Sequence, residues 1–248
     1  MRSTTSPTSI TDSRARSAEG PGARPVRLAI ALDLDDQVAA LALANEVQPY
    51  FAIAKVGLEL FSASGPEIVT KLREAGVSVF VDLKLHDIPT TVERAARALG
   101  SLGAEFATVH ASGGVDMVRA AVTGFGEGAA AAGLQAPTVL GVTVLTSDTD
   151  APPELLLRRV EVLLAAGAGG LVCAADDLLV IRQAAPDLVA VVPGIRPSGA
   201  GTDDQARAAT PAAAVANGAD VLVIGRPVSR AADPRGAARA IADELGIS

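Results

Sequence analysis

The sequence is short of the residues that mark disulfide-bonded, zinc-binding and nucleic-acid-binding proteins. Its 248 residues include one cysteine, Cys173, and two histidines, so we expect neither a disulfide nor a metal site. The net charge of −7 and the lack of a basic cluster argue against a surface for nucleic acid. No apolar run approaches the roughly 20 residues of a membrane-spanning helix. The sequence therefore predicts a cytoplasmic protein without a membrane segment.

Aromatic residues and lysines are scarce too. Aromatic residues make up 2% of a chain that is 49% hydrophobic, so Ala and Val must fill the core, which suits short helices packed on a parallel sheet. Among 21 basic residues only Lys55, Lys71 and Lys84 are lysines. Lys71 falls in a helical pattern, whereas the other two end strand-like runs. Because lysine can release a proton near neutral pH and arginine cannot, these two are candidates for proton transfer.

The first 25 residues differ in composition from the rest of the chain. They are rich in Ser, Thr, Arg, Pro and Gly and show no apolar periodicity, which predicts a disordered tail over 1–25. The apolar core of a secretory signal is missing, and Asp12 and Glu19 count against a transit peptide. Residues 26–248 suit a single domain.

Within that domain, strand-like and helix-like segments alternate eight times. The expected strands are 26–32, 51–56, 77–84, 105–110, 138–145, 170–173, 188–192 and 220–224. The expected helices are 36–47, 66–75, 91–102, 115–132, 153–166, 177–185, 210–217 and 234–245. This alternation predicts an α/β protein with a single (β/α)8 TIM barrel. A doubly wound open sheet is the alternative, but the turn after the first strand lacks glycine.

The third expected strand carries an unusual row of charges. Period two puts Phe80, Asp82 and Lys84 on one face, and Asp87 follows in a turn that a proline ends. One interpretation is a structural ion pair at a strand end. The other is a catalytic row at the mouth of a barrel, where such barrels keep their active sites. Three charged groups within six residues favour the second interpretation.

Charged residues also end the first two strands. Asp33 follows the first strand, and because Asp35 or Asp36 can cap the next helix, Asp33 is available for binding. Lys55 ends the second strand, where a buried lysine needs a carboxylate partner. Asp33 and Asp82, on the two neighbouring strands, are the candidates.

Other strand ends carry weaker signals. His110 ends the fourth strand and could act as a base, although a structural role is commoner, and His86 is expected at an interface. Thr146 follows the fifth strand, where its hydroxyl either closes a turn or contacts a polar ring.

The loops after strands seven and eight predict a phosphate site, as in other barrels. The first loop is long and glycine-rich, like a lid, and contains Arg196 and Gln205. The second begins with Gly225 and Arg226, which together offer a backbone amide and a guanidinium to an anion.

The segment DLKLHDIPTT resembles the signature D-x-K-x-x-D-I-P-x-T of the orotidine 5′-monophosphate decarboxylase family. Thr90 stands where that family usually has Asn. The motif TVHASGG around His110 is similar as well, and the resemblance runs from Ala29 to the end of the chain. It implies the conversion of orotidine 5′-monophosphate to uridine 5′-monophosphate and CO2, the last step of pyrimidine synthesis, without a metal or other cofactor.

The resemblance also implies roles for individual residues. Asp33 and Lys55 would contact the ribose hydroxyls. Asp82 and Lys84 would lie at the reacting centre, where Lys84 would donate the proton.

Further roles concern the two ends of the nucleotide and a second subunit. The phosphate and its loop would be contacted by Arg196, Gln205, Gly225 and Arg226, and the pyrimidine by Thr146. Asp87 and Thr91 would reach the site of the neighbouring subunit, so the resemblance implies a homodimer with shared active sites. Ile88 would contact the substrate.

Two other functions stay open on the sequence alone. A magnesium-dependent sugar-phosphate lyase, such as 3-keto-gulonate 6-phosphate decarboxylase, resembles the chain in D-x-K-x-x-D but lacks the following Ile-Pro. A non-catalytic phosphate-binding barrel would bind uridine 5′-monophosphate without converting the orotate nucleotide, since a fold does not fix a function.

Overall fold

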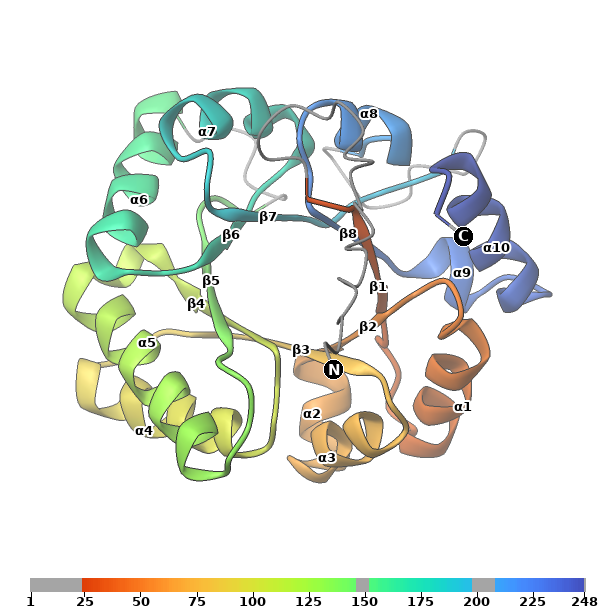
Figure 1. Ribbon diagram of the computed structural model, residues 1–248, viewed down its shortest axis with the longest axis horizontal. Coiled ribbons are helices and arrows are strands. Elements are labelled where there is room, and N and C mark those ends of the chain that lie inside the picture. Colours follow the sequence, from red (N-terminus) through yellow and green to blue (C-terminus); the bar gives the residue numbers. More distant parts are fainter. Residues whose placement is uncertain (1–23, 146–151, 198–207, 248) are drawn as a thin grey trace, which may run out of the picture.

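The protein folds into a closed barrel of eight parallel strands, which pair in the order of the chain (Figure 1). The computed structural model describes residues 24–145, 152–197 and 208–247. The strands are β1 (Arg27–Ala31), β2 (Ile53–Gly57), β3 (Ser78–Leu85), β4 (Phe106–His110), β5 (Thr138–Val142), β6 (Gly170–Val172), β7 (Val189–Val192) and β8 (Val221–Ile224). This architecture confirms the predicted (β/α)8 barrel.

Helices surround the barrel in a ring (Figure 1). They are α1 (Gln37–Val47), α2 (Leu58–Ser64), α3 (Glu67–Glu74), α4 (Pro89–Ser101), α5 (Gly114–Ala131), α6 (Pro153–Ala166), α7 (Leu178–Ala184), α8 (Pro211–Ala216), α9 (Arg226–Ser229) and α10 (Pro234–Glu244). Short 3₁₀ turns over Ala111–Gly113 and Ala175–Asp177 precede α5 and α7. None of the helices in the described ranges is long and apolar enough to cross a membrane.

Two details differ from the sequence prediction. Helices α2 and α9 were not predicted, because they have seven and four residues and too few turns to show a periodic pattern. Strand β5 ends at Val142 rather than 145. The predicted tail, 1–25, lies outside the described residues except for its last two. Of these, Arg24 donates a hydrogen bond to the carbonyl of Asp187 at 2.7 Å.

The core has two layers, as alternation along parallel strands requires. A smaller cluster fills the inside of the barrel and includes Ile53, Phe80, Phe106, Leu140 and Val223. A larger cluster packs the outer faces of the strands against the helices. The rings of Phe80 and Phe106 meet edge to face inside the barrel, with centroids 6.1 Å apart.

The helix that follows the charged strand is fixed by close contact with its neighbour. A methyl group on Gly124 or Gly128 of α5 would lie 2.1 or 2.0 Å from a carbonyl oxygen of α4, and one on Gly100 would lie 2.2 Å from a carbonyl of α5. Only glycine allows the two backbones to approach so closely. Helix α4 begins at Pro89, so this packing also anchors the turn that carries Asp87.

A charged cluster lies at the amino ends of the strands. Arg27 donates hydrogen bonds of 2.5 and 2.9 Å to the two carboxylate oxygens of Glu105, and Ser78 also donates to Glu105. Burial disfavours the charge of Glu105, but the hydrogen bonds from Arg27 and Ser78 and the charge of Arg27 outweigh it and hold the pKa of Glu105 below its usual range. In such barrels this end serves stability rather than catalysis.

The lowered pKa predicts how stability depends on pH. A carboxylate whose pKa falls on folding stabilises the protein above its unfolded pKa, about 4.3, and loses this effect as the pH falls through the folded value. Glu105→Gln should therefore lower the free energy of unfolding at pH 7 by about 1 kcal/mol. This is less than a buried charged hydrogen bond contributes, because the Glu105 side chain is 34% exposed. Urea unfolding should show that the difference in unfolding free energy between wild type and Glu105→Gln shrinks below about pH 4. Asp116→Asn, at a side chain that is 88% exposed, is the control and should show no such trend.

Candidate active site

A pocket with a volume of about 570 Å³ opens at the carboxyl ends of the strands. Its wall includes residues that end or follow β1, β2, β3, β7 and β8. Charged residues line it together with apolar ones, among them Val142, Val172 and Pro193. Volume and lining suit a small molecule with one apolar face and several polar groups.

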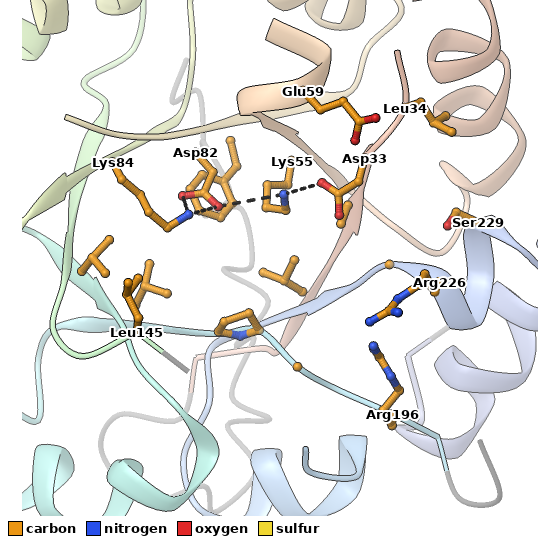
Figure 2. Close-up of a pocket in the computed structure, with 18 of the residues that line it drawn as sticks. Asp33, Leu34, Lys55, Glu59, Asp82, Lys84, Leu145, Arg196, Arg226 and Ser229 are labelled. Carbon is orange, nitrogen blue, oxygen red and sulfur yellow. Dashed lines mark hydrogen bonds and ion pairs between the residues drawn. The ribbon is translucent and has the colours of Figure 1, made fainter. Parts of the chain in front are cut away.

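Four charged side chains form a row along one wall of the pocket (Figure 2). Nζ of Lys55 lies 3.0 Å from Oδ1 of Asp33 and 3.9 Å from Oδ2 of Asp82. Nζ of Lys84 donates to both carboxylate oxygens of Asp82, each at 2.9 Å. The charges alternate along the row, as the sequence predicted for Lys55 and its two carboxylate neighbours.

The inner members of the row are the most buried. The side chains of Lys55 and Asp82 are 12% and 14% exposed, that of Lys84 is 30% exposed, and that of Asp33 is 60% exposed. Burying charges is unfavourable unless they are paired, and here each ammonium has a carboxylate within hydrogen-bond distance. The pairing leaves the Lys84 ammonium partly open to the pocket.

Residues Phe80, Asp82 and Lys84 all line the pocket, which agrees with the predicted common face. The strand is not regular there, however. The register between β3 and β4 shifts between Val81 and Leu85, and Lys84 has a φ of +52°. A β-bulge of this kind re-aims side chains next to active sites.

The absence of a side chain at Gly57 makes room for part of the row. A Cβ atom at this position would lie 3.1 Å from Nζ of Lys55 and 3.3 Å from Oδ1 of Asp33. The ion pair between these residues therefore rests against bare backbone. Asp36 accepts hydrogen bonds from Val38 and Ala39 and caps α1, which leaves Asp33 to the pocket as predicted.

Two arginines line the pocket at the end away from Lys84 (Figure 2). Arg226 begins α9 directly after Gly225, and Arg196 is 8% exposed. The backbone amide of Arg196 donates to the carbonyl of Ala209 at 2.9 Å, so these two residues lie side by side. Two guanidinium groups at one end of a pocket favour an anion such as a phosphate.

Three predicted site residues lie outside the pocket of their own chain. Asp87, Ile88 and Thr91 are exposed at the start of α4, as is Thr90. Oδ1 of Asp87 accepts a hydrogen bond from the amide of Ile88 at 2.6 Å. The predicted residues Thr146 and Gln205 lie outside the described parts of the chain.

The two histidines lie together beside the charged row, with ring centroids 5.5 Å apart. Burial, together with the positive charges of His86 and Lys84, holds the pKa of His110 below its usual value. Within the described ranges, no three His, Cys, Asp or Glu side chains converge in a way that could hold a metal ion.

Comparison with known proteins assigns the chain to a family. The model of the orotidine 5′-phosphate decarboxylase / HUMPS family matches residues 26–241. The chain belongs to this family. Among its relatives is the orotidine 5′-phosphate decarboxylase of Anaeromyxobacter dehalogenans, 50% identical over 88% of this chain and 98% of that protein.

Further relatives agree in sequence and in structure. The orotidine 5′-phosphate decarboxylase of Thermobifida fusca is 47% identical over 88% of this chain and 95% of that protein. The crystal structure of the Lactobacillus acidophilus enzyme of the same name superimposes with a TM-score of 0.76 at 36% identity, covering 90% of this chain and 99% of that one. The chain thus spans nearly the full length of these members of the orotidine 5′-phosphate decarboxylase / HUMPS family.

Sequence analysis of this family member missed one buried polar residue at the site. The hydroxyl of Thr108 in β4 donates a 3.0 Å hydrogen bond to Oδ1 of Asp82. The alternation that places Phe106 inside the barrel also places Thr108 there. The period of two along β4 could therefore have predicted that Thr108 faces the barrel interior. Pocket residues Glu59 and Ser229, from the short helices α2 and α9, carried no comparable signal.

Proposed function

We propose that the protein decarboxylates orotidine 5′-monophosphate to uridine 5′-monophosphate and CO2, the last step of pyrimidine biosynthesis. The observation that carries the proposal is one pocket with a row of alternating charges along one wall and two arginines at the end away from Lys84. A nucleoside monophosphate has matching ends, a reacting ring and a phosphate. The names of the relatives support the same substrate.

The chemical step requires stabilisation of a carbanion. When the bond between C6 and the carboxylate breaks, the electron pair stays on C6, in an orbital that the ring does not delocalise, and CO2 leaves. The ammonium of Lys84 stabilises this charge and transfers one proton to C6, which leaves a neutral amine that solvent reprotonates. The mechanism needs no electron sink.

Asp82 contributes in two ways of unequal size. Its carboxylate lies where the leaving carboxylate must come close, and two unit charges 4 Å apart repel by about 4 kcal/mol at an effective dielectric constant of 20. Demanding enzymatic rate enhancements need roughly 20 kcal/mol, so repulsion supplies a minor part. The two 2.9 Å hydrogen bonds that hold the Lys84 ammonium in place are the second contribution.

Binding of the remote end of the substrate supports the reaction at the ring. Arg196, Arg226, Gly225 and Gln205 are proposed to bind the phosphate, and Asp33 and Lys55 the ribose hydroxyls. Thr146 is proposed to contact the pyrimidine. Interactions with non-reacting groups can orient the substrate and hold loops closed over it, which lowers the barrier to reaction.

The arrangement of Lys55 favours a metal-free mechanism over a magnesium-dependent one. Its ammonium lies between Asp33 and Asp82, at 3.0 and 3.9 Å. A magnesium ion bound by these carboxylates would need the same space and would meet a positive charge there. The residues therefore fit a nucleotide decarboxylase better than a magnesium-dependent sugar-phosphate lyase.

An absorbance assay with orotidine 5′-monophosphate tests the proposal. We expect turnover that excess EDTA leaves unchanged. Loss of turnover in EDTA, with recovery on adding Mg²⁺, would point to the magnesium-dependent alternative. Binding of uridine 5′-monophosphate without turnover of the orotate nucleotide would point to a non-catalytic barrel.

The active site is proposed to be shared between two subunits of a homodimer. Asp87, Ile88 and Thr91 face away from their own pocket, and the apolar side chain of Ile88 is 66% exposed. Proline at the first position of α4 and the packing of α4 on α5 fix this turn. In a two-fold dimer, each subunit would place these residues at the other's pocket.

Replacement of Arg226 should separate phosphate binding from the chemical step. Arg226→Ala should lower kcat/KM for orotidine 5′-monophosphate by roughly 10- to 100-fold, since hydrogen bonds between charged groups contribute about 1.5–3 kcal/mol. Turnover of orotidine, which lacks the phosphate, should change little. Steady-state kinetics with both substrates measures this. Equal losses on the two substrates would mean that Arg226 acts on the fold and not on the phosphate.

A further inference from the structure

Thr108 is buried beneath the charged row, although it does not line the pocket. It is 1% exposed. Among the described residues, only Thr143 and Arg196 are also polar or charged and buried. It lies in β4 on the same side as Phe106, inside the barrel. A buried hydroxyl must be satisfied by hydrogen bonds.

The hydroxyl of Thr108 makes two hydrogen bonds that join the backbone of Lys84 to the side chain of Asp82. It accepts a 2.8 Å bond from the backbone amide of Lys84 and donates a 3.0 Å bond to Oδ1 of Asp82. A hydroxyl has one proton, so accepting from the amide leaves that proton for the carboxylate. Oδ1 of Asp82 thus receives one bond from Thr108 and one from Nζ of Lys84.

These bonds lie where β3 departs from regular geometry. From Val81 to Leu85 the chain takes four steps along β3, whereas the paired residues Ala107 and Val109 are two steps apart on β4. Lys84 is the one residue other than glycine with a positive φ in the described ranges. L-residues avoid this conformation, and it persists only where neighbouring groups hold it. The Thr108 hydroxyl is the side-chain group that meets the Lys84 amide.

We propose that Thr108 is a positioning residue for the decarboxylation. Its hydroxyl accepts a hydrogen bond from the backbone amide of Lys84 and so holds that backbone in the bulge. The same hydroxyl donates to Asp82 and so orients the carboxylate that pairs with the Lys84 ammonium. Thr108 does not line the pocket, so its effect passes through Lys84 and Asp82, which do. The inference rests on the proposed function, in which these two residues act at the reacting centre.

Substitution of Thr108 tests this role. Thr108→Val removes the hydroxyl and nearly keeps the shape, and Thr108→Ser keeps the hydroxyl. We expect kcat of the valine variant to fall roughly 10- to 100-fold, as when a hydrogen bond to a charged group is lost. KM for orotidine 5′-monophosphate should change less than about threefold, because the phosphate contacts remain. The serine variant should recover most of kcat.

Thr143→Val is the matched control. Thr143 is 0% exposed, and its hydroxyl donates a 2.9 Å bond to the carbonyl of Val172, away from the charged row. It should lose thermal stability as Thr108→Val does but keep its kcat. Equal losses of kcat in both variants, or normal kcat in Thr108→Val, would overturn the proposal. If Thr108→Val does not fold, Thr108→Ala replaces it with the same expected outcome.

A measurement without turnover separates this proposal from the proposed function. Wild-type protein without decarboxylase activity would refute the proposed function alone. Amide hydrogen exchange at Lys84, followed by NMR, should be at least about tenfold faster in Thr108→Val than in wild type, because the amide loses its acceptor. In Thr143→Val it should be unchanged. Unchanged exchange in Thr108→Val would refute the positioning role whatever the reaction.

Discussion

Lys84→Arg should lower kcat for orotidine 5′-monophosphate by about 10²–10⁴-fold, the range that general acid catalysis contributes. Arginine keeps the positive charge and can pair with Asp82, but it does not release a proton near neutral pH. The variant therefore retains electrostatic stabilisation and loses the proton donor. Stopped-flow or steady-state absorbance measures the loss, and calorimetric titration with uridine 5′-monophosphate checks that the pocket still binds nucleotide.

Lys71→Arg provides a matched control for this substitution. Lys71 lies in α3, its side chain is 41% exposed, and its ammonium is 3.4 Å from Glu67. The same chemical change there should leave kcat unaltered. If Lys84→Arg keeps more than about a tenth of the wild-type kcat, Lys84 is not the proton donor, since general acid catalysis contributes more than that.

A mixture of two inactive variants should regain activity if the sites are shared. Lys84→Ala removes the proton donor, and Asp87→Ala removes the carboxylate that is proposed to enter the neighbouring subunit's pocket. In a mixed dimer, one site carries both changes and the other carries neither. With random exchange half the dimers are mixed, so roughly a quarter of all sites should be intact, as two-fold symmetry requires.

The experiment consists of unfolding the two variants together, refolding them and assaying the product. Different affinity tags on the two chains confirm that subunits have exchanged and allow mixed dimers to be isolated. Each variant refolded alone gives the baseline. Activity equal to the sum of the two baselines, in a preparation that contains mixed dimers, would show that Asp87 does not complete the neighbouring site.

Much of the site could be predicted because it depends on topology and residue type. Alternating segments predicted the barrel, and parallel strands bring their carboxyl ends to one face. Asp33, Lys55 and Asp82 end or approach the ends of β1, β2 and β3, which are neighbours in the barrel. Burial then required a carboxylate partner for Lys55, and it pairs with both candidates. These predictions needed only strand order and the unfavourable energy of an unpaired buried charge.

What could not be predicted depends on local departures from regular structure. The assumption that side chains alternate along a regular strand predicted the correct face for Lys84. It did not predict the bulge that places Lys84 there. A bulge reflects the fit between two strands, so the sequence of β3 alone does not reveal it. The partners of Thr108 became visible only with the shifted register. For Asp87, the sequence indicated an outward turn, and the surface that we propose it meets would belong to another chain.

The left-handed backbone at Lys84 has a consequence for the stability of the whole protein. A non-glycine residue in this conformation costs on the order of 1 kcal/mol relative to glycine. Lys84→Ala and Lys84→Gly both lack the ammonium, so they differ mainly in this backbone term. We expect both to be inactive, with the glycine variant unfolding at a higher urea concentration than the alanine variant. On the proposed mechanism, part of the folding free energy is lost in holding the Lys84 ammonium in position, as at other strained functional sites.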